Sequence, residues 1–237
     1  MTGIGETAMV LAAGLGMRMR PLTDARPKPL IEVKGRVLID YAFDKLRAAG
    51  VRKAVVNVHY LADQMIAWSK RQTSPAVEIS DERAEVLDTG GGIALALPRL
   101  GREPFFVLNS DSFWIDGERP ALRRLRATWD DASMDCLLLL CPLNRTVGYD
   151  GKGDFLIGAD GRLSRRKEDA GPALVYAGCY LVHPRLFRAA PPGKFSMNLL
   201  WDRAIAEARL FGLAHDGTWI HVGAPAAIAG AEAALTG

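Results

Sequence analysis

One stretch near the start of the 237-residue chain limits the possible folds more than any other. Residues 9–12 form an apolar run typical of a buried strand, and Gly14 and Gly16 follow it closely. Glycines placed after a strand let backbone N–H groups approach a charged ligand, because no Cβ blocks them. Arg18 and Lys28 complete the stretch. We interpret it as a polyphosphate-binding loop at the carboxyl end of a strand, where ligands bind in open α/β sheets.

Two better-known phosphate-binding loops do not fit this stretch. In the dinucleotide-binding pattern Gly-x-Gly-x-x-Gly counted from Gly14, Met19 stands where the third glycine belongs. A P-loop ends in Gly-Lys-Ser/Thr, and the sequence contains no such run. A plain glycine turn with solvated basic residues is the remaining alternative. It does not explain Lys28 between two prolines, which we expect to hold the lysine in an extended conformation.

Strand-like and helix-like segments alternate through the first part of the chain. Apolar and β-branched runs predict strands at 51–58, 76–80, 104–111 and 135–141, and apolar residues at helical spacing predict helices at 37–49, 61–72 and 120–129. This alternation predicts an α/β fold with a largely parallel sheet flanked by helices.

The alternation loosens after about residue 145. There the sequence predicts a hairpin over 153–163, strands at 176–182, 210–214 and 217–223, and helices at 197–208 and 225–235. We expect a single domain over residues 1–237 that divides into two halves at about residue 145.

Composition narrows the partners. The formal net charge of +3 is too small to indicate nucleic acid, and we interpret the cluster Arg123, Arg124 and Arg126 as a solvated helix face. No apolar run is long enough for a membrane span, and the first residues do not resemble a signal peptide. Three cysteines without zinc-like spacing indicate free thiols in a reducing compartment. We therefore expect a cytoplasmic protein that binds neither nucleic acid nor a membrane.

Two further segments carry candidate ligand contacts. Three consecutive glycines follow Asp88 and Thr89, just before a helix-like run. They would offer a nucleobase a flat surface without side chains. A tight loop–helix junction is the alternative. Asp111 ends the apolar run at 104–111, where a carboxylate is well placed to bind Mg²⁺. Strand-end aspartates also cap helices, so the assignment of Asp111 depends on the glycine loop.

The opening stretch, L-A-A-G-L-G-M-R-M-R-P-L-T followed by P-K-P, resembles the signature of the sugar-1-phosphate nucleotidyltransferases. The segments D-T-G-G-G, S-D, G-K-G-D-F and Y-A-G-C-Y extend the resemblance over most of the chain. Within this family the sequence is most similar to the small bacterial N-acetylmuramic acid 1-phosphate uridylyltransferases, and slightly less similar to the mannose-1-phosphate guanylyltransferases. The resemblance implies a Rossmann-like nucleotidyltransferase fold, with a nucleotide-binding half at about 1–145 and a sugar-binding half, a smaller β lobe, at about 146–237.

The resemblance also implies a set of site residues. Catalysis would depend on Arg18, Lys28 and Asp111. The nucleotide would contact Leu11, Ala12, Ala13, Gly14, Gly16, Met17, Arg18, Lys28, Asp88, Gly90 and Gly91. The sugar would contact Asn109, Asp154, Glu168 and Gly178, although the basic residues that precede Glu168 make it equally a candidate for a surface salt bridge.

One position departs from the family pattern. Where the family has W-x-D-x-G-T-P, with an aspartate that completes the metal site, this chain has His221, and Ala224 replaces the threonine. The implied cofactor is Mg²⁺ bound by Asp111 and His221, with Mn²⁺ as an alternative, because imidazole suits a softer ion.

The implied reaction joins an NTP, with UTP favoured, to a sugar 1-phosphate, with N-acetylmuramic acid 1-phosphate favoured, and releases pyrophosphate. The alternatives are a mannose-1-phosphate guanylyltransferase, a non-catalytic nucleotide-sugar sensor on the same fold and a choline-phosphate cytidylyltransferase. The last would line its acceptor pocket with aromatic side chains, whereas G-K-G-D-F favours a sugar. We expect a monomer or a small homo-oligomer.

Overall fold

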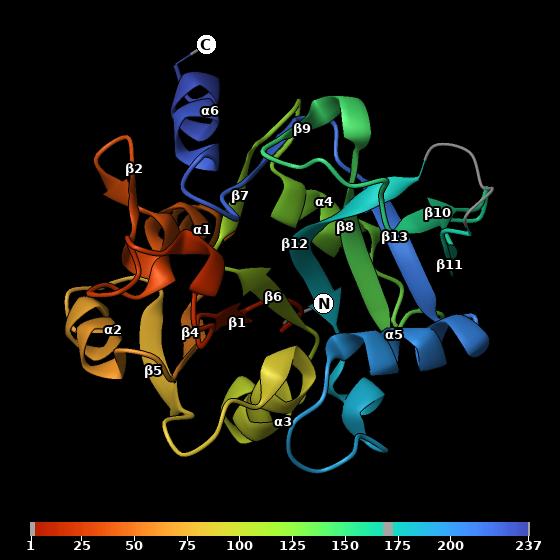
Figure 1. The fold of residues 1–237 in the computed structure, drawn as a ribbon. Helices are drawn as coiled ribbons and strands as arrows, with labels where there is room; N and C mark the ends of the chain where they lie inside the picture. Colours follow the sequence, from red (N-terminus) through yellow and green to blue (C-terminus); the bar gives the residue numbers. More distant parts are fainter. Residues whose placement is uncertain (1–2, 168–172, 237) are drawn as a thin grey trace.

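The computed structural model describes residues 3–167 and 173–236 (Figure 1). The helices are α1 (Leu38–Ala48), α2 (Ala62–Ser69), α3 (Asp88–Leu100), α4 (Ala121–Thr128), α5 (Met197–Ala206) and α6 (Ala227–Ala234). Short 3₁₀ helices cover Met17–Met19, Lys28–Leu30, Leu143–Arg145 and Pro184–Phe187. The strands are β1 (Thr7–Leu11), β2 (Glu32–Val33), β3 (Arg36–Val37), β4 (Lys53–Val58), β5 (Ala76–Asp81), β6 (Phe105–Asn109), β7 (Ser112–Ile115), β8 (Cys136–Pro142), β9 (Thr146–Val147), β10 (Phe155–Ile157), β11 (Leu163–Arg165), β12 (Leu174–Val182), β13 (Leu210–Ala214) and β14 (Thr218–His221).

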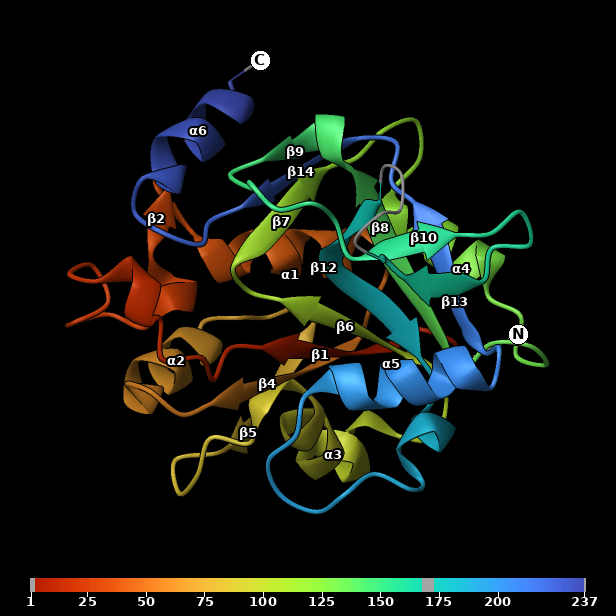
Figure 2. The same cartoon turned by 45° about the vertical axis from the view of Figure 1, so that its right-hand side comes forward.

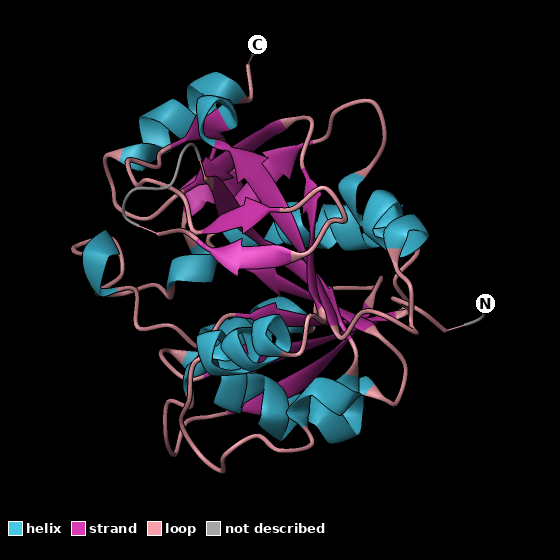
Figure 3. Cartoon of the chain, turned by 90° about the vertical axis from the view of Figure 1, so that its right-hand side faces the viewer, coloured by secondary structure: helices cyan, strands magenta, loops and turns pink. Residues whose placement is uncertain are grey.

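Within the described ranges, a nine-stranded sheet runs through the middle of the molecule, with helices packed around it (Figure 3). Its first half has the spatial order β6-β1-β4-β5 and is parallel throughout. Side chains alternate across β1: Ala8 and Val10 pack in the core cluster of α1 and α2, and Met9 packs in that of α3. Because helices cover both faces, β1, β4 and β6 are apolar on both sides, as the sequence predicts, whereas the edge strand β5 is largely exposed.

The second half of the sheet is mixed. Strand β12 is antiparallel to β6, β8 and β10, whereas β13 is parallel to β8. The α/β class is confirmed, but the parallel arrangement is limited to the first half and to the β8–β13 pair. The hairpin β10–β11, predicted within a smaller β lobe, extends the main sheet through β12.

A bulge divides β12 at Gly178. The register between β12 and β8 shifts between Tyr176 and Tyr180, and Gly178 lies between them with φ +70°. A Cβ at this position would come within 2.3 Å of the Ser112 hydroxyl oxygen, so the close approach of β12 to Ser112 requires glycine. On one side of the bulge β12 pairs with β10, and on the other it pairs with β6. A gap between β6 and β10 results, and it contributes to the site described below.

A three-stranded sheet, β7-β14-β9, lies beside the main sheet, and Gly223, two residues after β14, lines the site described below. His221 pairs with Ser112 in its register, which brings the end of β14 next to the turn that follows β6. Val222 donates its N–H to the Asp111 carbonyl at 3.0 Å. Helix α6 packs behind this sheet with Val222 and Ala231 in a third apolar cluster, far from α3 and α5 (Figures 1 and 2).

Three local expectations were wrong. The three glycines form the first turns of α3, which begins at Asp88, rather than a loop before a helix. Lys28 begins a 3₁₀ helix instead of lying in extended backbone, and only Pro27 before it is extended. The arginines of α4 are not simply solvated: the Arg126 guanidinium donates to the Ala49 and Gly5 carbonyls.

The sequence reasoning also overlooked β7, β9 and the β2–β3 hairpin, which are two to four residues long. Segments this short carry too few residues for an alternation to be recognised. Across the parts of the chain that are described, no helix has the length and hydropathy needed to cross a membrane.

Candidate active site

The loop after β1 is held by contacts within its own turn. Gly16 has φ +64°, and its carbonyl accepts hydrogen bonds from Met19 N–H at 2.9 Å and Thr23 Oγ1 at 2.8 Å. A Cβ at Gly16 would lie 3.2 Å from Lys28 Cβ, so the close packing of the two segments also favours glycine. Met19 is fully buried and anchors the 3₁₀ turn, while Arg18 is exposed on it. The turn therefore presents Arg18 on a fixed backbone.

Lys28 and Asp111 form an ion pair at the bottom of the site, although 83 residues separate them in the sequence. The Lys28 Nζ lies 2.7 Å from Asp111 Oδ2, and the side chains are 12% and 28% exposed. Burial opposes the charge on Asp111, but the Lys28 ammonium, with smaller contributions from His221 and Arg18, outweighs it and holds the pKa of the carboxyl below its usual value. The structure thus brings together the three predicted catalytic residues.

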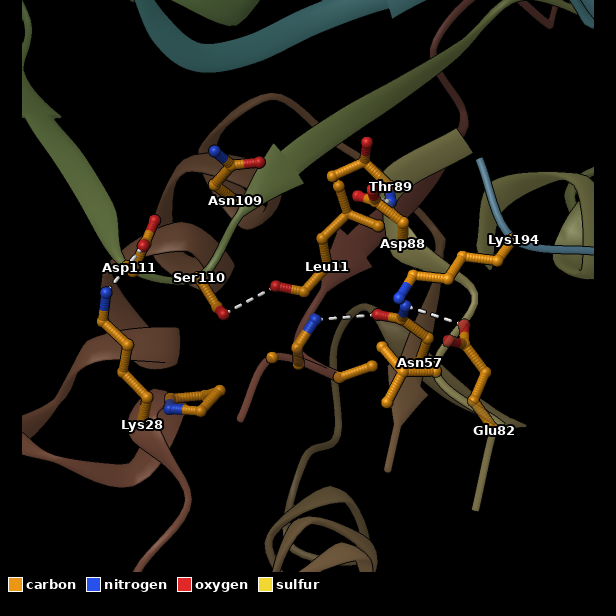
Figure 4. Close-up of a pocket in the computed structure, with 15 residues that line it drawn as sticks. Leu11, Lys28, Asn57, Glu82, Asp88, Thr89, Asn109, Ser110, Asp111 and Lys194 are labelled. Atoms are coloured by element: carbon orange, nitrogen blue, oxygen red, sulfur yellow. Dashed lines mark hydrogen bonds and ion pairs between the residues drawn. The ribbon is translucent and has the colours of Figure 1, made fainter. Parts of the chain in front are cut away.

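Three adjoining hollows make up the site, and the ion pair lines two of them. The first, of about 230 Å³, is lined by Gly14, Gly16, Met17, Arg18, Met19, Lys28, Asp111 and Gly223. The second, of about 410 Å³, shares Gly14, Lys28 and Asp111 with the first and extends to Glu82 and Lys194 (Figure 4). The third, of about 250 Å³, shares Leu11, Asp88, Thr89 and Asn109 with the second and extends to Asp154 and Trp201. We call them the phosphate-end, central and far hollows.

Asn57 and Glu82 form a hydrogen-bond network in the wall of the central hollow. The sequence reasoning did not assign this network to the site. Asn57 accepts a hydrogen bond from Ala12 N–H at 2.7 Å and donates to Glu82 Oε1 at 2.8 Å (Figure 4). Burial raises the pKa of Glu82, against the hydrogen bonds from Asn57 and from Leu87 N–H. His59 contacts the Glu82 carbonyl through Nδ1 at 2.7 Å. The sequence signal that could have revealed this network was the polar Asn57 near the end of an otherwise apolar strand.

The glycines of α3 pack against the chain rather than lining a hollow. Gly90 and Gly91 both donate N–H to the Phe195 carbonyl, and a Cβ on Gly91 would lie 2.3 Å from the Gly193 carbonyl oxygen. This close packing places Lys194, from the same segment, in the wall of the central hollow. The packing alone accounts for these glycines, so a direct contact of Gly90 or Gly91 with a base stays a prediction. Asp88 lines both the central and the far hollow.

The predicted sugar contacts lie around the far hollow. Asn109 belongs to its wall, and Asp154 Oδ2 accepts a hydrogen bond from Tyr176 N–H at 2.8 Å. Gly178 lies behind Asn109 at the bulge, since its Cβ would meet the Asn109 side chain at 3.3 Å. Glu168 lies outside the described residues.

The predicted metal-binding pair is Asp111 and His221; the charge of Asp111 acts on the imidazole, although His221 does not line the phosphate-end hollow. Burial lowers the pKa of His221, against the attraction of Asp111, and so favours the neutral imidazole that binds metals. Its buried Nδ1 has no hydrogen-bond partner in the described residues. One carboxylate and one imidazole fit an ion whose other ligands are phosphate and water. Considering residues 3–167 and 173–236, no group of three or more His, Cys, Asp and Glu could hold an ion alone.

Comparison with known proteins identifies the family. The model of the MobA-like NTP transferase domain matches residues 8–190. The chain belongs to this family. The N-acetylmuramate alpha-1-phosphate uridylyltransferase of Caulobacter vibrioides is 46% identical to this transferase, covering 97% of each chain. The enzyme of the same name from Neisseria meningitidis serogroup B is 33% identical, covering 91% of this chain and 92% of its own.

Solved structures agree with the fold of the transferase. A UDP-glucose pyrophosphorylase in complex with UDP-glucose superposes with a TM-score of 0.80, covering 99% of both chains at 16% identity. The family and fold implied by the opening stretch are confirmed. The individual residue assignments stay predictions, because these comparisons do not examine single residues.

Proposed function

We propose that this chain transfers UMP from UTP to N-acetylmuramic acid 1-phosphate, giving the UDP-sugar and pyrophosphate. Two uridylyltransferases named for this acceptor match it over 97% and 91% of its length. The observation that carries the proposal is the position of the Lys28–Asp111 pair on the wall shared by the phosphate-end and central hollows. The central hollow in turn shares Asn109 with the far hollow. The phosphate-end hollow would take the β- and γ-phosphates, the central and far hollows would take the nucleoside and the sugar, and the reacting phosphates would meet beside Lys28 and Asp111.

The residues at this junction suit a phosphoryl-type substitution. A non-bridging oxygen of the sugar phosphate attacks the α-phosphorus of UTP, and the bond from that phosphorus to the β-bridging oxygen breaks. The electron pair leaves with pyrophosphate. A phosphate monoester is largely ionised at neutral pH, with a second pKa of about 6, so no general base is needed. Positioning and charge neutralisation therefore supply most of the catalysis.

Each cation of the site has a distinct task in this proposal. Arg18 lines the phosphate-end hollow and would bind the β- and γ-phosphates and then the leaving pyrophosphate. Lys28, which borders both hollows, would neutralise charge on the phosphate that reacts. Lys194 lies across the central hollow. Asp111 and His221 would hold a Mg²⁺ or Mn²⁺ ion, which would supply further charge neutralisation when bound.

The proposal is tested by measuring pyrophosphate release for four NTPs against several sugar 1-phosphates. We expect UTP with N-acetylmuramic acid 1-phosphate to give the highest kcat/KM. If GTP with mannose 1-phosphate were used at least as well, the guanylyltransferase alternative would replace this proposal. Binding of UTP without pyrophosphate release from any pair would indicate a non-catalytic sensor.

A further inference from the structure

The far hollow has an aromatic wall with one cation in it. Phe155, Tyr176, Tyr180 and Trp201 line the hollow, and their rings contact one another, with Tyr176 and Trp201 centroids 5.0 Å apart. Of the described residues that line this hollow, Arg165 alone carries a positive charge, whereas Asp88 and Asp154 are acidic. The rings alone would suit the choline-phosphate alternative, but the Arg165 cation beside them would repel a quaternary ammonium. A neutral sugar needs no cation here either, so Arg165 calls for an explanation in terms of the ligand.

Arg165 is held in place from two sides. It lies opposite Phe155 in the β10–β11 register, and its guanidinium carbon is 4.6 Å from the Phe155 ring centroid and 6.0 Å from that of Trp201. On the other side, Nε donates to Asp202 at 2.8 Å and Nη2 donates to Asn198 Oδ1 at 2.9 Å. These contacts fix the plane of the guanidinium and reduce the entropy that a ligand would otherwise have to remove.

The Arg165 guanidinium can still donate hydrogen bonds to a ligand. Its Nη1 donates to no acceptor in the described part of the chain, and the Arg165 side chain is 36% exposed. Asp202 is 60% exposed and is not part of the hollow's wall, so water screens its charge on the far side of Arg165. An anion that enters the hollow can therefore accept from the free edge of Arg165.

We propose that Arg165 binds the lactyl carboxylate of the acceptor and selects N-acetylmuramic acid 1-phosphate over N-acetylglucosamine 1-phosphate. This inference rests on the function proposed above. The two acceptors differ only in the lactyl ether on O3, whose carboxylate is the one negative charge on the sugar ring portion. A hydrogen bond from the free Nη1 of this fixed guanidinium to a carboxylate is charge-assisted and about twice as strong as one between neutral groups. Asp88 and Asp154 would repel that carboxylate elsewhere in the hollow, which restricts it to the Arg165 side.

The test compares the two acceptors in the full-length enzyme with Arg165→Gln. We expect the KM for N-acetylmuramic acid 1-phosphate to rise about tenfold or more, as for a lost hydrogen bond to a charged group, with little change in kcat. The KM of N-acetylglucosamine 1-phosphate, or its inhibition constant if it turns over too slowly, should stay within about twofold. Added salt should raise the KM for the lactyl acceptor more steeply in the wild type than in the variant, because both bind the acceptor phosphate but only the wild type pairs Arg165 with the carboxylate.

Arg162→Gln is the matched control. Arg162 precedes β11, pairs with Asp160 at 2.6 Å and lies over the Phe211 ring at 5.1 Å, but it does not line the far hollow. It should leave both acceptors unchanged. The KM for UTP and the melting temperature report whether each variant is folded.

The outcomes separate the two proposals. Equal losses for both acceptors, or none, in a folded Arg165→Gln enzyme would overturn the assignment of Arg165 while the reaction itself stands. If the wild-type enzyme did not use the lactyl acceptor with UTP, both proposals would fail.

Discussion

Arg18 and Lys28 contribute charge to the same site but differ in how the fold uses them. Arg18 is exposed, whereas Lys28 is largely buried against Asp111. We expect either residue changed to alanine to lower kcat/KM by about 10²- to 10³-fold, as for the loss of one preorganised donor. Only Lys28→Ala should also lower the melting temperature, because it leaves Asp111 without its ion-pair partner.

Arg20→Ala is the control for this pair. Arg20 is exposed on the same loop and pairs with Asp24 at 3.3 Å, outside the three hollows. It should keep wild-type kcat/KM. If Arg18→Ala did the same, Arg18 would have no part in the reaction.

His221 is the residue expected to determine which metal ion the site prefers. Asp111 is the carboxylate of the phosphate-end hollow, and imidazole is a poor ligand for a hard cation. We expect activity that needs Mg²⁺ at roughly millimolar concentration or prefers Mn²⁺, and we expect His221→Asp to lower the Mg²⁺ requirement. Asp111→Ala should abolish turnover. Titrations of both ions against both variants measure this.

Strong Mg²⁺ binding by the wild type without nucleotide would contradict this expectation, because it would require another carboxylate. Asp216 is a poor candidate, since it pairs with Arg124 at 2.6 Å and lines none of the three hollows.

At the scale of secondary-structure elements, the contact between α3 and segment 193–195 depends on close packing of the two backbones. Gly91→Ala would bring its methyl group against the Gly193 carbonyl, which cannot rotate away as a side chain could. We expect a loss of about 1–3 kcal/mol in the free energy of unfolding. The KM for UTP should rise as well, because Lys194 moves with the segment. Denaturant unfolding and initial rates measure both effects.

Gly230→Ala is the control for that loss. Gly230 is exposed within α6, and its Cβ would meet its nearest neighbour at an ordinary 3.6 Å. This variant should gain about 0.5–1 kcal/mol from helix propensity. A stable Gly91→Ala with unchanged KM would show that the α3 contact does not position Lys194.

Asp116 ties three elements together by its carboxylate. It accepts from Lys45 of α1 at 2.6 Å, from Trp114 of β7 at 2.9 Å and from Ala121 N–H at the start of α4 at 2.8 Å. Burial opposes its charge, but these contacts outweigh it and lower its pKa below 3.8. Its contribution to stability is therefore complete above the ordinary pKa and is lost as the pH falls through the lowered pKa.

Asp116→Asn should consequently destabilise the protein by about 1–3 kcal/mol at pH 7. The difference from wild type should shrink as the pH falls below the ordinary value of 3.8. Chemical denaturation at several pH values measures it. A difference that did not depend on pH would assign the effect to packing instead of charge.

At the scale of the whole molecule, the three cysteines report on global opening. Cys136, Cys141 and Cys179 are fully buried, and burial raises the pKa of each thiol, that of Cys141 to about 11. Because the thiolate is the reactive form, we expect a thiol reagent to label none of them quickly in the native protein. All three should react after unfolding in denaturant. Fast labelling of one thiol in the native state would reveal local opening of its strand.

The sequence by itself determined the elements whose signals are local. The apolar runs of β1, β4 and β6 and the helical spacing of α1 predicted the parallel half of the sheet, because burial between two helix layers demands apolar residues throughout. The glycines and Arg18 predicted a tight turn with an exposed cation after β1, because a positive φ favours glycine; that this turn binds phosphate stays a prediction. These features need no knowledge of distant contacts.

Only the tertiary structure decided which distant residues meet. Lys28 and Asp111 form their pair because the 3₁₀ turn and the end of β6 share one edge of the fold. The glycines of α3 became helical because segment 193–195 packs on them, which overrides the weak helix propensity of glycine. Arg165 enters the far hollow because the bulge at Gly178 turns β12 from β6 toward β10. Pairings of this kind depend on long-range packing, which local pattern does not encode.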